Sequence, residues 1–362
     1  MDGIAQKPPP GRLTARAPAL QWLAILILSL IGAGALEAAA LPAALLIGPM
    51  LAGIVAGING ATVRVPRAAF GAAQAIVGCL VAASISPGIF PTFAADWPLI
   101  LGAVAATLIA SSVLGWLISR WRILPGTTAV WGSSPGAATA MVLMAGAFGA
   151  DQRLVAFMQY LRVIFVSMAA AVLARLWVDT AGVEAPATVW FPAIDPKPFA
   201  ATLSVALAGA GAGRLLRLPS PYFLGTMMLG TVLHLGAGID LQLPHWLLAI
   251  SYAAVGWAIG LNFTMPILRH AARALPQIVA AILVLITVCG AIAWLISRTL
   301  GIDPLTAYLA TSPGGMDSIA IIAAAADNVD ISFVMALQTV RFLIVLLLGP
   351  GIARLIARTV RE

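Results

Sequence analysis

Long runs of apolar residues, separated by short polar connections, extend over almost the whole chain of 362 residues. No run alternates apolar and polar positions, so the pattern predicts helices and not strands. Most runs are long enough to cross a hydrocarbon layer of about 30 Å. Twelve apolar segments can be drawn: Ala19–Leu36, Leu41–Ile58, Ala69–Phe90, Trp97–Ile118, Ile123–Phe148, Leu154–Val178, Phe199–Gly213, Leu218–Gly236, Trp246–Thr264, Leu275–Ser297, Pro304–Ala326 and Ile331–Ala353.

The segments group into two membrane repeats, residues 19–178 and 199–354, with tails at residues 1–18 and 355–362. Residues 179–198 between them are rich in proline and acidic side chains and are predicted to form an exposed linker. Three separate landmarks recur in the second repeat at a nearly constant distance along the chain, which indicates a duplication. They are Leu41–Gly53 with Leu218–Gly230, Ser134–Gly136 with Ser312–Gly314, and Asp151, Gln159 and Arg162 with Asp330, Gln338 and Arg341.

The composition agrees with a membrane protein and excludes a water-soluble fold. Apolar residues make up 61% of the chain and charged residues 9%, against about 25% charged residues in soluble domains. The net charge of +7 comes from lysines and arginines scattered between apolar runs, not clustered with aromatic residues. Such scatter is typical of the loops of membrane proteins, so we expect no nucleic-acid partner.

Cysteine and histidine give no sign of metal or redox chemistry. Cys79 and Cys289 each lie inside an apolar segment, which excludes a disulfide framework. His234, His245 and His270 are isolated from one another, so no zinc or copper site and no cofactor is expected. The chain also lacks a phosphate-binding loop of the Walker type, which argues against transport driven by ATP hydrolysis in this chain.

The fifth segment of each repeat is interrupted near its middle by Ser-Pro-Gly. Such a segment either crosses as a broken helix or enters and leaves on one side as a hairpin. With two hairpins and a cytoplasmic N-terminus, 15 of the 20 lysines and arginines lie inside, 3 outside and 2 in the membrane; with two crossings, 13 lie inside and 5 outside. The positive-inside rule favours the hairpins. The predicted fold is therefore all-helical, with about ten transmembrane helices and two interrupted helices in two inverted repeats, and with an uncleaved first helix and both termini cytoplasmic.

The two interruptions are the predicted site for a solute or ion, because paired broken helices mark the binding site in many transporters. Freed N–H groups of each second arm would face an anion, and freed carbonyls of each first arm would face a cation. The alternative is a pair of kinks that only helps packing. The residues concerned are Ser133, Ser134, Pro135 and Gly136 in the first repeat, and Thr311, Ser312, Pro313, Gly314 and Gly315 in the second.

Asp317 is the only acidic residue inside an apolar run. A carboxylate costs a few kcal/mol in a membrane helix and is by default functional there. We therefore expect it to bind H⁺, Na⁺ or a substrate cation, the alternative being a salt bridge to an arginine. Its counterpart in the first repeat is Thr139, so the repeats differ chemically.

A glutamine and an arginine three residues apart recur on the sixth segment of each repeat, Gln159 with Arg162 and Gln338 with Arg341. This spacing places both side chains on one helix face. A guanidinium fork suits a carboxylate or phosphate, or could pair with Asp317. Snorkelling, or pairing with the matched acids of the two repeats, remains the alternative. Ser84 and Asn262, at matched third segments, are weaker candidates.

Four stretches of the chain resemble the signature runs of the AbrB family of bacterial membrane proteins. They are Trp131–Ala137, Phe157–Arg162, Thr311–Ser318 and Met335–Arg341, and the resemblance extends from about Trp22 to Arg354. It implies a multi-pass protein of the bacterial inner membrane, inverted repeats as in cation:proton antiporters and anion transporters, and a connection with the regulation of gene expression. Some members carry a monooxygenase label, which isolated histidines do not support. The first interruption departs from the usual two-glycine form, because Ala137 follows Gly136.

Three functions are compatible with these features. The leading one is a secondary transporter of a small solute, with an anion as one option, coupled to H⁺ or Na⁺ through Asp317; it would affect gene expression indirectly. The second is a membrane sensor that acts through a partner without transport. The third, a membrane enzyme, is disfavoured. The expected partners are the lipid bilayer, the solute and the coupling ion. Small-residue helices such as Ala206–Gly213 permit close helix contacts within one chain or between two copies, so a monomer and a homo-oligomer are both compatible with the sequence.

Overall fold

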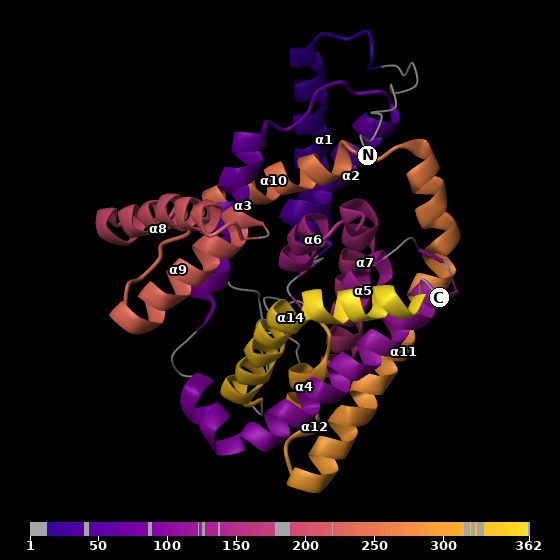
Figure 1. Cartoon of the computed structure of the whole chain (residues 1–362), viewed down its shortest axis with the longest axis vertical. Coiled ribbons are helices and arrows are strands. Elements are labelled where there is room, and N and C mark those ends of the chain that lie inside the picture. Colours follow the sequence, from indigo (N-terminus) through magenta and orange to yellow (C-terminus); the bar gives the residue numbers. More distant parts are fainter. Residues whose placement is uncertain are drawn as a thin grey trace. The chain divides into compact units, whose positions relative to one another are not determined.

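The computed structural model describes residues 13–39, 43–85, 89–121, 123–124, 127–136, 138–177, 189–218, 220–314, 319, 323 and 329–360. Helices make up most of these residues, and none of them lies in a strand (Figure 1). The prediction of an all-helical fold is thus confirmed. The chain divides into two compact units, and each unit takes segments from both repeats.

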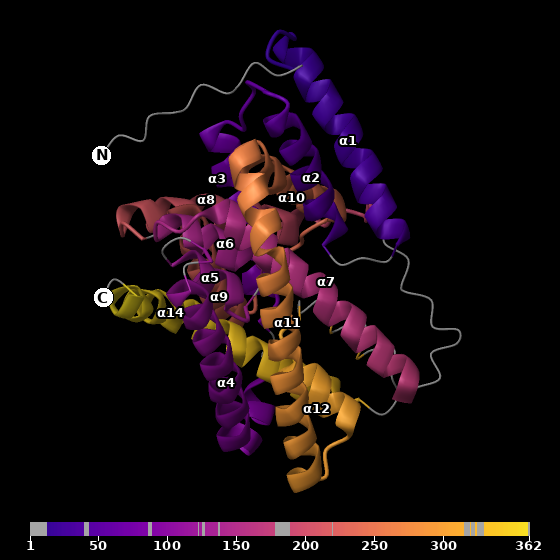
Figure 2. The same ribbon diagram turned by 90° about the vertical axis from the view of Figure 1, so that its right-hand side faces the viewer.

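The first unit comprises residues 1–80, 190–230 and 241–273. Its helices are the first three of each repeat. They are α1 (Pro18–Ala38), α2 (Ala44–Ile58) and α3 (Arg67–Ala83, of which residues 67–80 belong here) from the first repeat, and α8 (Pro196–Leu215), α9 (Pro221–Ala237, of which residues 221–230 belong here) and α10 (His245–Gly260) from the second. Within this unit α2 packs against both α1 and α10, and the views in Figures 1 and 2 show α1 and α2 side by side.

The second unit comprises residues 81–189, 231–240 and 274–362. It contains the remaining helices of each repeat, including both interrupted segments. They are α4 (Ile89–Arg120), α5 (Thr128–Ser133), α6 (Ala138–Ala147), α7 (Gln152–Trp177), α11 (Met265–Leu300, of which residues 274–300 belong here), α12 (Pro304–Thr311) and α14 (Ile331–Val360). In this unit α4 packs against α5 and α14, and α6 packs against α7.

Glycines at matched positions allow the helices of the first unit to pack closely. A Cβ on Gly78 of α3 would lie 2.6 Å from the carbonyl oxygen of Phe223 in α9. A Cβ on Gly256 of α10 would lie 2.7 Å from the carbonyl oxygen of Leu46 in α2. Real Cβ atoms do not approach this closely, so only glycine fits. These contacts join matched residues of the two repeats, which supports the duplication read from the sequence.

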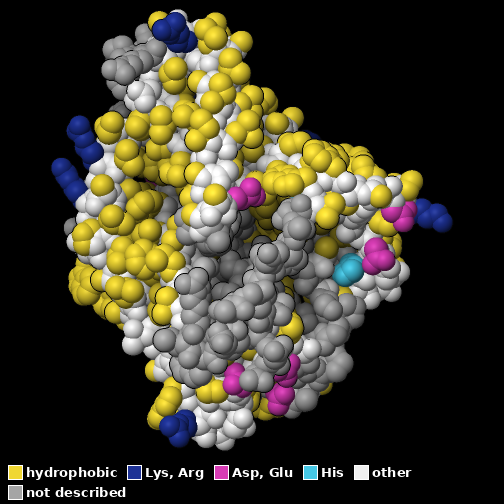
Figure 3. All heavy atoms as spheres, turned by 180° about the vertical axis from the view of Figure 1, so that it is seen from behind, with side chains coloured by type: hydrophobic (Ala, Val, Ile, Leu, Met, Phe, Trp, Pro, Cys, Tyr) yellow, Lys and Arg dark blue, Asp and Glu magenta, His cyan; other side chains and the backbone are white. Residues whose placement is uncertain are grey.

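Five described helices are long and apolar enough to cross a membrane: Pro18–Ala38, Asp96–Arg120, Gln152–Ala170, Met265–Leu300 and Ile331–Ile356. Shorter apolar helices, such as α2 and α10, accompany them. Hydrophobic side chains cover large parts of the described surface in Figure 3, with few charged groups among them. This surface suits a lipid environment, since monomeric soluble proteins rarely expose large apolar patches.

Several predicted boundaries differ from those of the helices. The apolar pattern extends the third segment to Phe90, but α3 ends at Ala83. Helix α4 begins at Ile89 and is kinked at Asp96, whose ψ of 25° is not helical, two residues before Pro98. Helix α11 begins at Met265, ahead of the predicted start at Leu275, because its first turns carry charged residues that a hydropathy pattern does not include.

We expect Gly209→Ala in α8 to destabilise the protein, although alanine is the better helix former. A Cβ at Gly209 would lie 2.5 Å from the Cα of Thr226, so the helices must separate or strain, at a cost of about 1–3 kcal/mol. Thermal unfolding of detergent-purified protein measures the effect. Gly211→Ala is the control, since a Cβ there meets nothing within 4 Å. Equal unfolding temperatures for the two variants would contradict the close packing of α8 on α9.

Candidate functional site

Both interrupted segments contain the same backbone break. Helix α5 ends at Ser133, and Ser134 is extended with φ −60° and ψ 124°. Helix α12 ends at Thr311, and Ser312 is extended with φ −61° and ψ 137°. A residue before proline is pushed out of the helical region, so the Ser-Pro pair fixes where each first arm ends. The predicted breaks are confirmed at residue level, and the last carbonyls of each arm lose their helical partners.

In the first repeat, Gln159 and Arg162 of α7 bind the carbonyls at the end of α5. The Gln159 Nε2 donates to the carbonyl oxygens of Trp131 (2.7 Å) and Ser134 (3.0 Å). The Arg162 Nη1 donates to the carbonyl oxygens of Ser133 (3.3 Å) and Ser134 (2.7 Å). The Arg162 Nη2 donates to Gly136 (3.4 Å) and to Gln159 Oε1 (2.7 Å). We call this pair of side chains the first clamp.

In the second repeat, Gln338 and Arg341 of α14 form an equivalent second clamp on α12. The Gln338 Nε2 donates to the carbonyl oxygens of Leu309 (2.8 Å) and Ser312 (3.1 Å). The Arg341 Nη1 donates to the carbonyl oxygens of Thr311 (3.2 Å) and Ser312 (2.9 Å), and its Nη2 donates to Gln338 Oε1. Every one of these acceptors is the duplicate of an acceptor in the first clamp.

The two clamps show that each arginine binds backbone carbonyls at the end of a helix. A guanidinium at a helix C-terminus lies at the negative end of the helix dipole, and here its Nη groups donate to the unpaired carbonyls. The interpretation of these Nη groups as a fork for a solute is therefore not supported by the geometry, because backbone carbonyls already occupy them. Snorkelling is excluded as well, since Arg162 and Arg341 are 1% and 2% exposed.

Neither clamp arginine forms an ion pair with an acid in the described part of the chain. Asp151 pairs with Arg153 at 2.8 Å instead, and Asp330 Oδ1 accepts from the backbone N–H of Phe333 (2.9 Å). Burial raises the pKa of the Asp151 carboxyl, but its bonds to Arg153 outweigh this and hold the pKa below its usual value. The Nε atoms of both clamp arginines are buried without a hydrogen-bond partner. Among the described residues, the two buried guanidinium groups therefore have no acidic partner.

The two breaks lie in one packed core. Helices α7 and α14 each contact both α5 and α12. A Cβ on Gly314 would lie 3.2 Å from Val166 of α7, one turn beyond Arg162. A Cβ on Gly349 of α14 would lie 3.6 Å from the ring of Trp131 in α5. Each break is thus held by its own clamp and touched by the clamp helix of the other repeat.

Hydroxyl groups of the site mostly serve the backbone. Ser134 Oγ donates to the carbonyl oxygen of Val130 (2.7 Å), and Thr311 Oγ1 donates to the carbonyl oxygens of Ala307 (3.0 Å) and Cys289 (3.2 Å). Thr139, the counterpart of Asp317, bonds the hydroxyl of Tyr160 at 3.1 Å. The hydroxyls of Ser134 and Thr311 therefore support the backbone of the two first arms.

Not all predicted site residues can be placed there. Gly315 and Asp317 lie outside the described residues. Ser84, just after the end of α3, belongs to the second unit, and Asn262 belongs to the first, where its Nδ2 donates to the carbonyl oxygen of Ala258 (2.6 Å). The matched third segments are thus divided between the two units.

The sequence analysis missed two matched threonines, one in each first arm. Thr128 Oγ1 accepts from the backbone N–H of Asp151 (3.3 Å), and Thr306 Oγ1 accepts from that of Asp330 (3.2 Å). Thr128 and Thr306 are separated by the same number of residues as Ser134 and Ser312. This constant separation between matched residues could have identified them from the sequence. Among the described residues, no group of three or more histidine, cysteine or acidic side chains could hold a metal ion.

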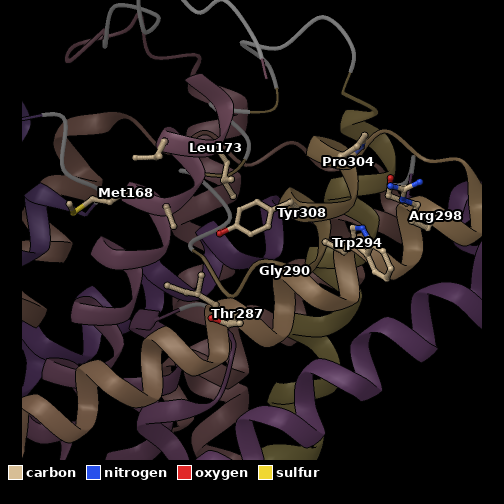
Figure 4. Close-up of a pocket in the computed structure, with 13 residues that line it drawn as sticks. Met168, Leu173, Thr287, Gly290, Trp294, Arg298, Pro304 and Tyr308 are labelled. Atoms are coloured by element: carbon tan, nitrogen blue, oxygen red, sulfur yellow. The ribbon is translucent and has the colours of Figure 1, made fainter. Parts of the chain in front are cut away.

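A cavity of about 970 Å³ lies beside the second break (Figure 4). Its walls come from α7, α11 and α12, and most of the lining side chains are apolar. Tyr308 of α12 lies in its middle, one turn before Thr311, and Gly290 of α11 follows Cys289, whose carbonyl binds Thr311. Sequence reasoning gave no indication of this cavity, since packing between distant segments creates it.

We expect Gln338→Glu to destabilise the second break. Glutamate keeps the size of glutamine and still accepts from Arg341, but it cannot donate to the carbonyls of Leu309 and Ser312. The Leu309 carbonyl then keeps only a long bond from the Ser312 hydroxyl (3.4 Å), whereas the Ser312 carbonyl still accepts from Arg341. The expected cost is therefore about 1–3 kcal/mol in all, mostly from the Leu309 carbonyl. The unfolding temperature in detergent should fall by several degrees.

Gln159→Glu should behave in the same way, because the first clamp has the same geometry. Gln277→Glu on α11 is the comparison, since Gln277 is exposed. If both clamp variants unfolded at the temperature of the parent protein, the clamps would not support the breaks.

Comparison with known proteins agrees with these features. The family model described as "Transition state regulatory protein AbrB" matches residues 45–357. A protein of Escherichia coli (strain K12) named "Putative regulator AbrB" is 48% identical over 341 residues, which cover 94% of this chain and 97% of that protein. A Bacillus subtilis (strain 168) protein named "Uncharacterized protein YhjN" is 25% identical over 297 residues, 78% of this chain and 77% of that protein. The matched region contains both breaks and both clamps, and the chain belongs to the AbrB family.

Proposed function

We propose that the protein is a secondary transporter of a small anionic solute, driven by H⁺ or Na⁺, with its site at the two breaks. The observation that carries the proposal is the pair of clamped breaks in one packed core. Irregular backbone at membrane depth is tolerated where it is buried in protein or lines a cavity. Two matched breaks, one per repeat, are the arrangement expected at a transporter's binding site.

The clamps favour an anion over a cation at this site. Carbonyls of the first arms would have been ligands for a cation, but the clamps already bind them. N–H groups at the start of the second arm, at Ala138 of α6, remain suited to an anion. Two buried guanidinium groups without an acidic partner among the described residues add positive potential. A carboxylate or phosphate would reduce this unbalanced charge.

The proposal retains the topology read from the charges. Ten transmembrane helices and two hairpins that enter from opposite faces place most lysines and arginines on the cytoplasmic side, with both termini there and the protein in the bacterial inner membrane. A duplicated unit with an odd number of crossings gives inverted repeats. Site access from both sides of the membrane follows from such an arrangement.

Asp317 is the proposed coupling residue. It is an acid inside an apolar run, three residues after Gly314, and such a group is by default functional. Protonation or Na⁺ binding would neutralise it when the anion binds nearby. The name of the Escherichia coli relative, a regulator, fits an indirect effect, since movement of a metabolite alters what transcription factors sense.

The proposal can be tested with proteoliposomes adsorbed on a solid-supported membrane. The anion concentration is raised suddenly, and the transient current is recorded. The probes are sodium salts of mono-, di- and tricarboxylates and of inorganic phosphate, with choline chloride as the blank. We expect at least one anion to give currents that depend on H⁺ or Na⁺, and Asp317→Asn to abolish this dependence. Asp240→Asn is the control, because Asp240 is exposed. Currents with unchanged ion dependence in Asp317→Asn would overturn the coupling role.

A membrane sensor that acts through a partner is the second candidate, and the regulator name of the relative favours it. It requires no movement of solute. Deletion should then change transcription in a way that no added solute reproduces, and crosslinking should capture a partner. Anion currents in purified proteoliposomes would decide for the transporter.

A further inference from the structure

The cavity between α7, α11 and α12 has a shape that the proposed solute site does not explain. On α11 its lining residues run from Ile286 to Arg298, which at 1.5 Å per residue is about 18 Å. Its volume of about 970 Å³ is at the upper end of the range of about 300–1,000 Å³ for ligand pockets. A long, mainly apolar cavity of this kind fits a chain-like molecule better than a small solute.

The cavity is open along a side that carries exposed apolar residues. Met168 and Val172 of α7 are 56% and 59% exposed, and Trp294 of α11 is 62% exposed. All three line the cavity (Figure 4). Both helices belong to those long and apolar enough to cross a membrane, so these side chains would face lipid. The occupant is then drawn from the bilayer and not from water.

One end of the cavity is positively charged. Arg298 lies in the last turn of α11, and its guanidinium is 5.8 Å from the centre of the Trp294 ring. Asp303, the next acid along the chain, caps α12 by accepting from the N–H groups of Leu305 and Thr306. Among the described residues, no acid forms an ion pair with Arg298. Arginine on an aromatic ring at a helix end is well placed for an acidic headgroup.

A hydroxyl group in the middle of the cavity lacks a partner. Tyr308 is 6% exposed, lines the cavity and has no hydrogen bond from its hydroxyl. A buried hydroxyl without an acceptor costs free energy, so an occupant that supplies an oxygen would be favoured. Tyr308 lies one helical turn, about 6 Å, from Pro304 at the charged end of the cavity. Ester oxygens of a phospholipid lie at a comparable depth below its phosphate.

We propose that this cavity binds an acidic phospholipid of the surrounding bilayer. Its headgroup phosphate pairs with Arg298, one of its oxygens accepts from the Tyr308 hydroxyl, and an acyl chain lies along α11 between Leu173 and Gly290. The same Trp-x-x-x-Arg spacing occurs at the matched position of the first repeat, Trp116 and Arg120 of α4. There, however, Gly115 packs directly against α5, since a Cβ on it would lie 3.0 Å from the Cα of Val130.

This repetition supplies a matched control. Native mass spectrometry of the full chain in detergent compares binding of phosphatidylglycerol and phosphatidylcholine with identical acyl chains. We expect the parent protein to prefer phosphatidylglycerol by about fivefold, the factor typical of one basic residue near a membrane surface. Arg298→Gln should remove the preference, whereas Arg120→Gln should keep it. Equal binding of the two lipids, or equal losses in the two variants, would overturn the proposal.

Two further variants test whether the lipid occupies the interior of the cavity as well as its charged end. Tyr308→Phe removes a hydroxyl that has no protein partner, so it should weaken phosphatidylglycerol binding by about fivefold without lowering thermal stability in lipid-free detergent. Gly290→Leu extends into open space, since a Cβ there meets nothing within 4 Å, and should reduce binding of both lipids. Gly102→Leu on α4, also without neighbours, should not. Undiminished binding in Tyr308→Phe and Gly290→Leu would show that the lipid lies elsewhere.

Discussion

The structure depends on the hydrogen bonds that the clamp residues donate to the broken helix ends. Each Ser-Pro interruption leaves carbonyls without helical partners inside a packed apolar core, where an unpaired polar group is expensive. Gln159 and Arg162 satisfy these carbonyls in one repeat, and Gln338 and Arg341 do so in the other. A break of this kind can persist in a low-dielectric surrounding only with such donors, so the clamps and the breaks form one structural unit.

The same bonds limit which polar groups at the two breaks are free. Because the Nη groups of both arginines and the carbonyls of both first arms are engaged with each other, neither set is free for a solute. The first N–H groups of a helix have no partner within that helix, and at the start of α6 such groups would suit an anion. The two buried guanidinium groups nevertheless contribute positive charge to the core.

The two repeats contain equivalent breaks and clamps, but they differ in chemistry at several matched positions. The clamps, the breaks and the glycine contacts recur at matched positions. Thr139 stands where the second repeat has Asp317, and Val130 stands where it has Tyr308. The Trp-Arg pair at the end of α4 packs near a filled interface, whereas the pair at the end of α11 borders a cavity. An acidic residue after the break and a cavity beside the break thus both occur at the second interruption, with α7 of the first repeat completing the cavity wall.

The sequence alone determined the helical class, the duplication, the position of the breaks and the residues around them, because apolar runs, Ser-Pro-Gly and a constant offset between matched residues are local or periodic signals. It also placed Gln159 and Arg162 on one helix face. What those side chains bind was decided only by tertiary structure, since the carbonyls of Trp131 and Ser134 come from another segment. The division of each repeat between two units, and the cavity beside Tyr308, likewise depend on packing between segments far apart in the chain, for which a single sequence carries no direct signal.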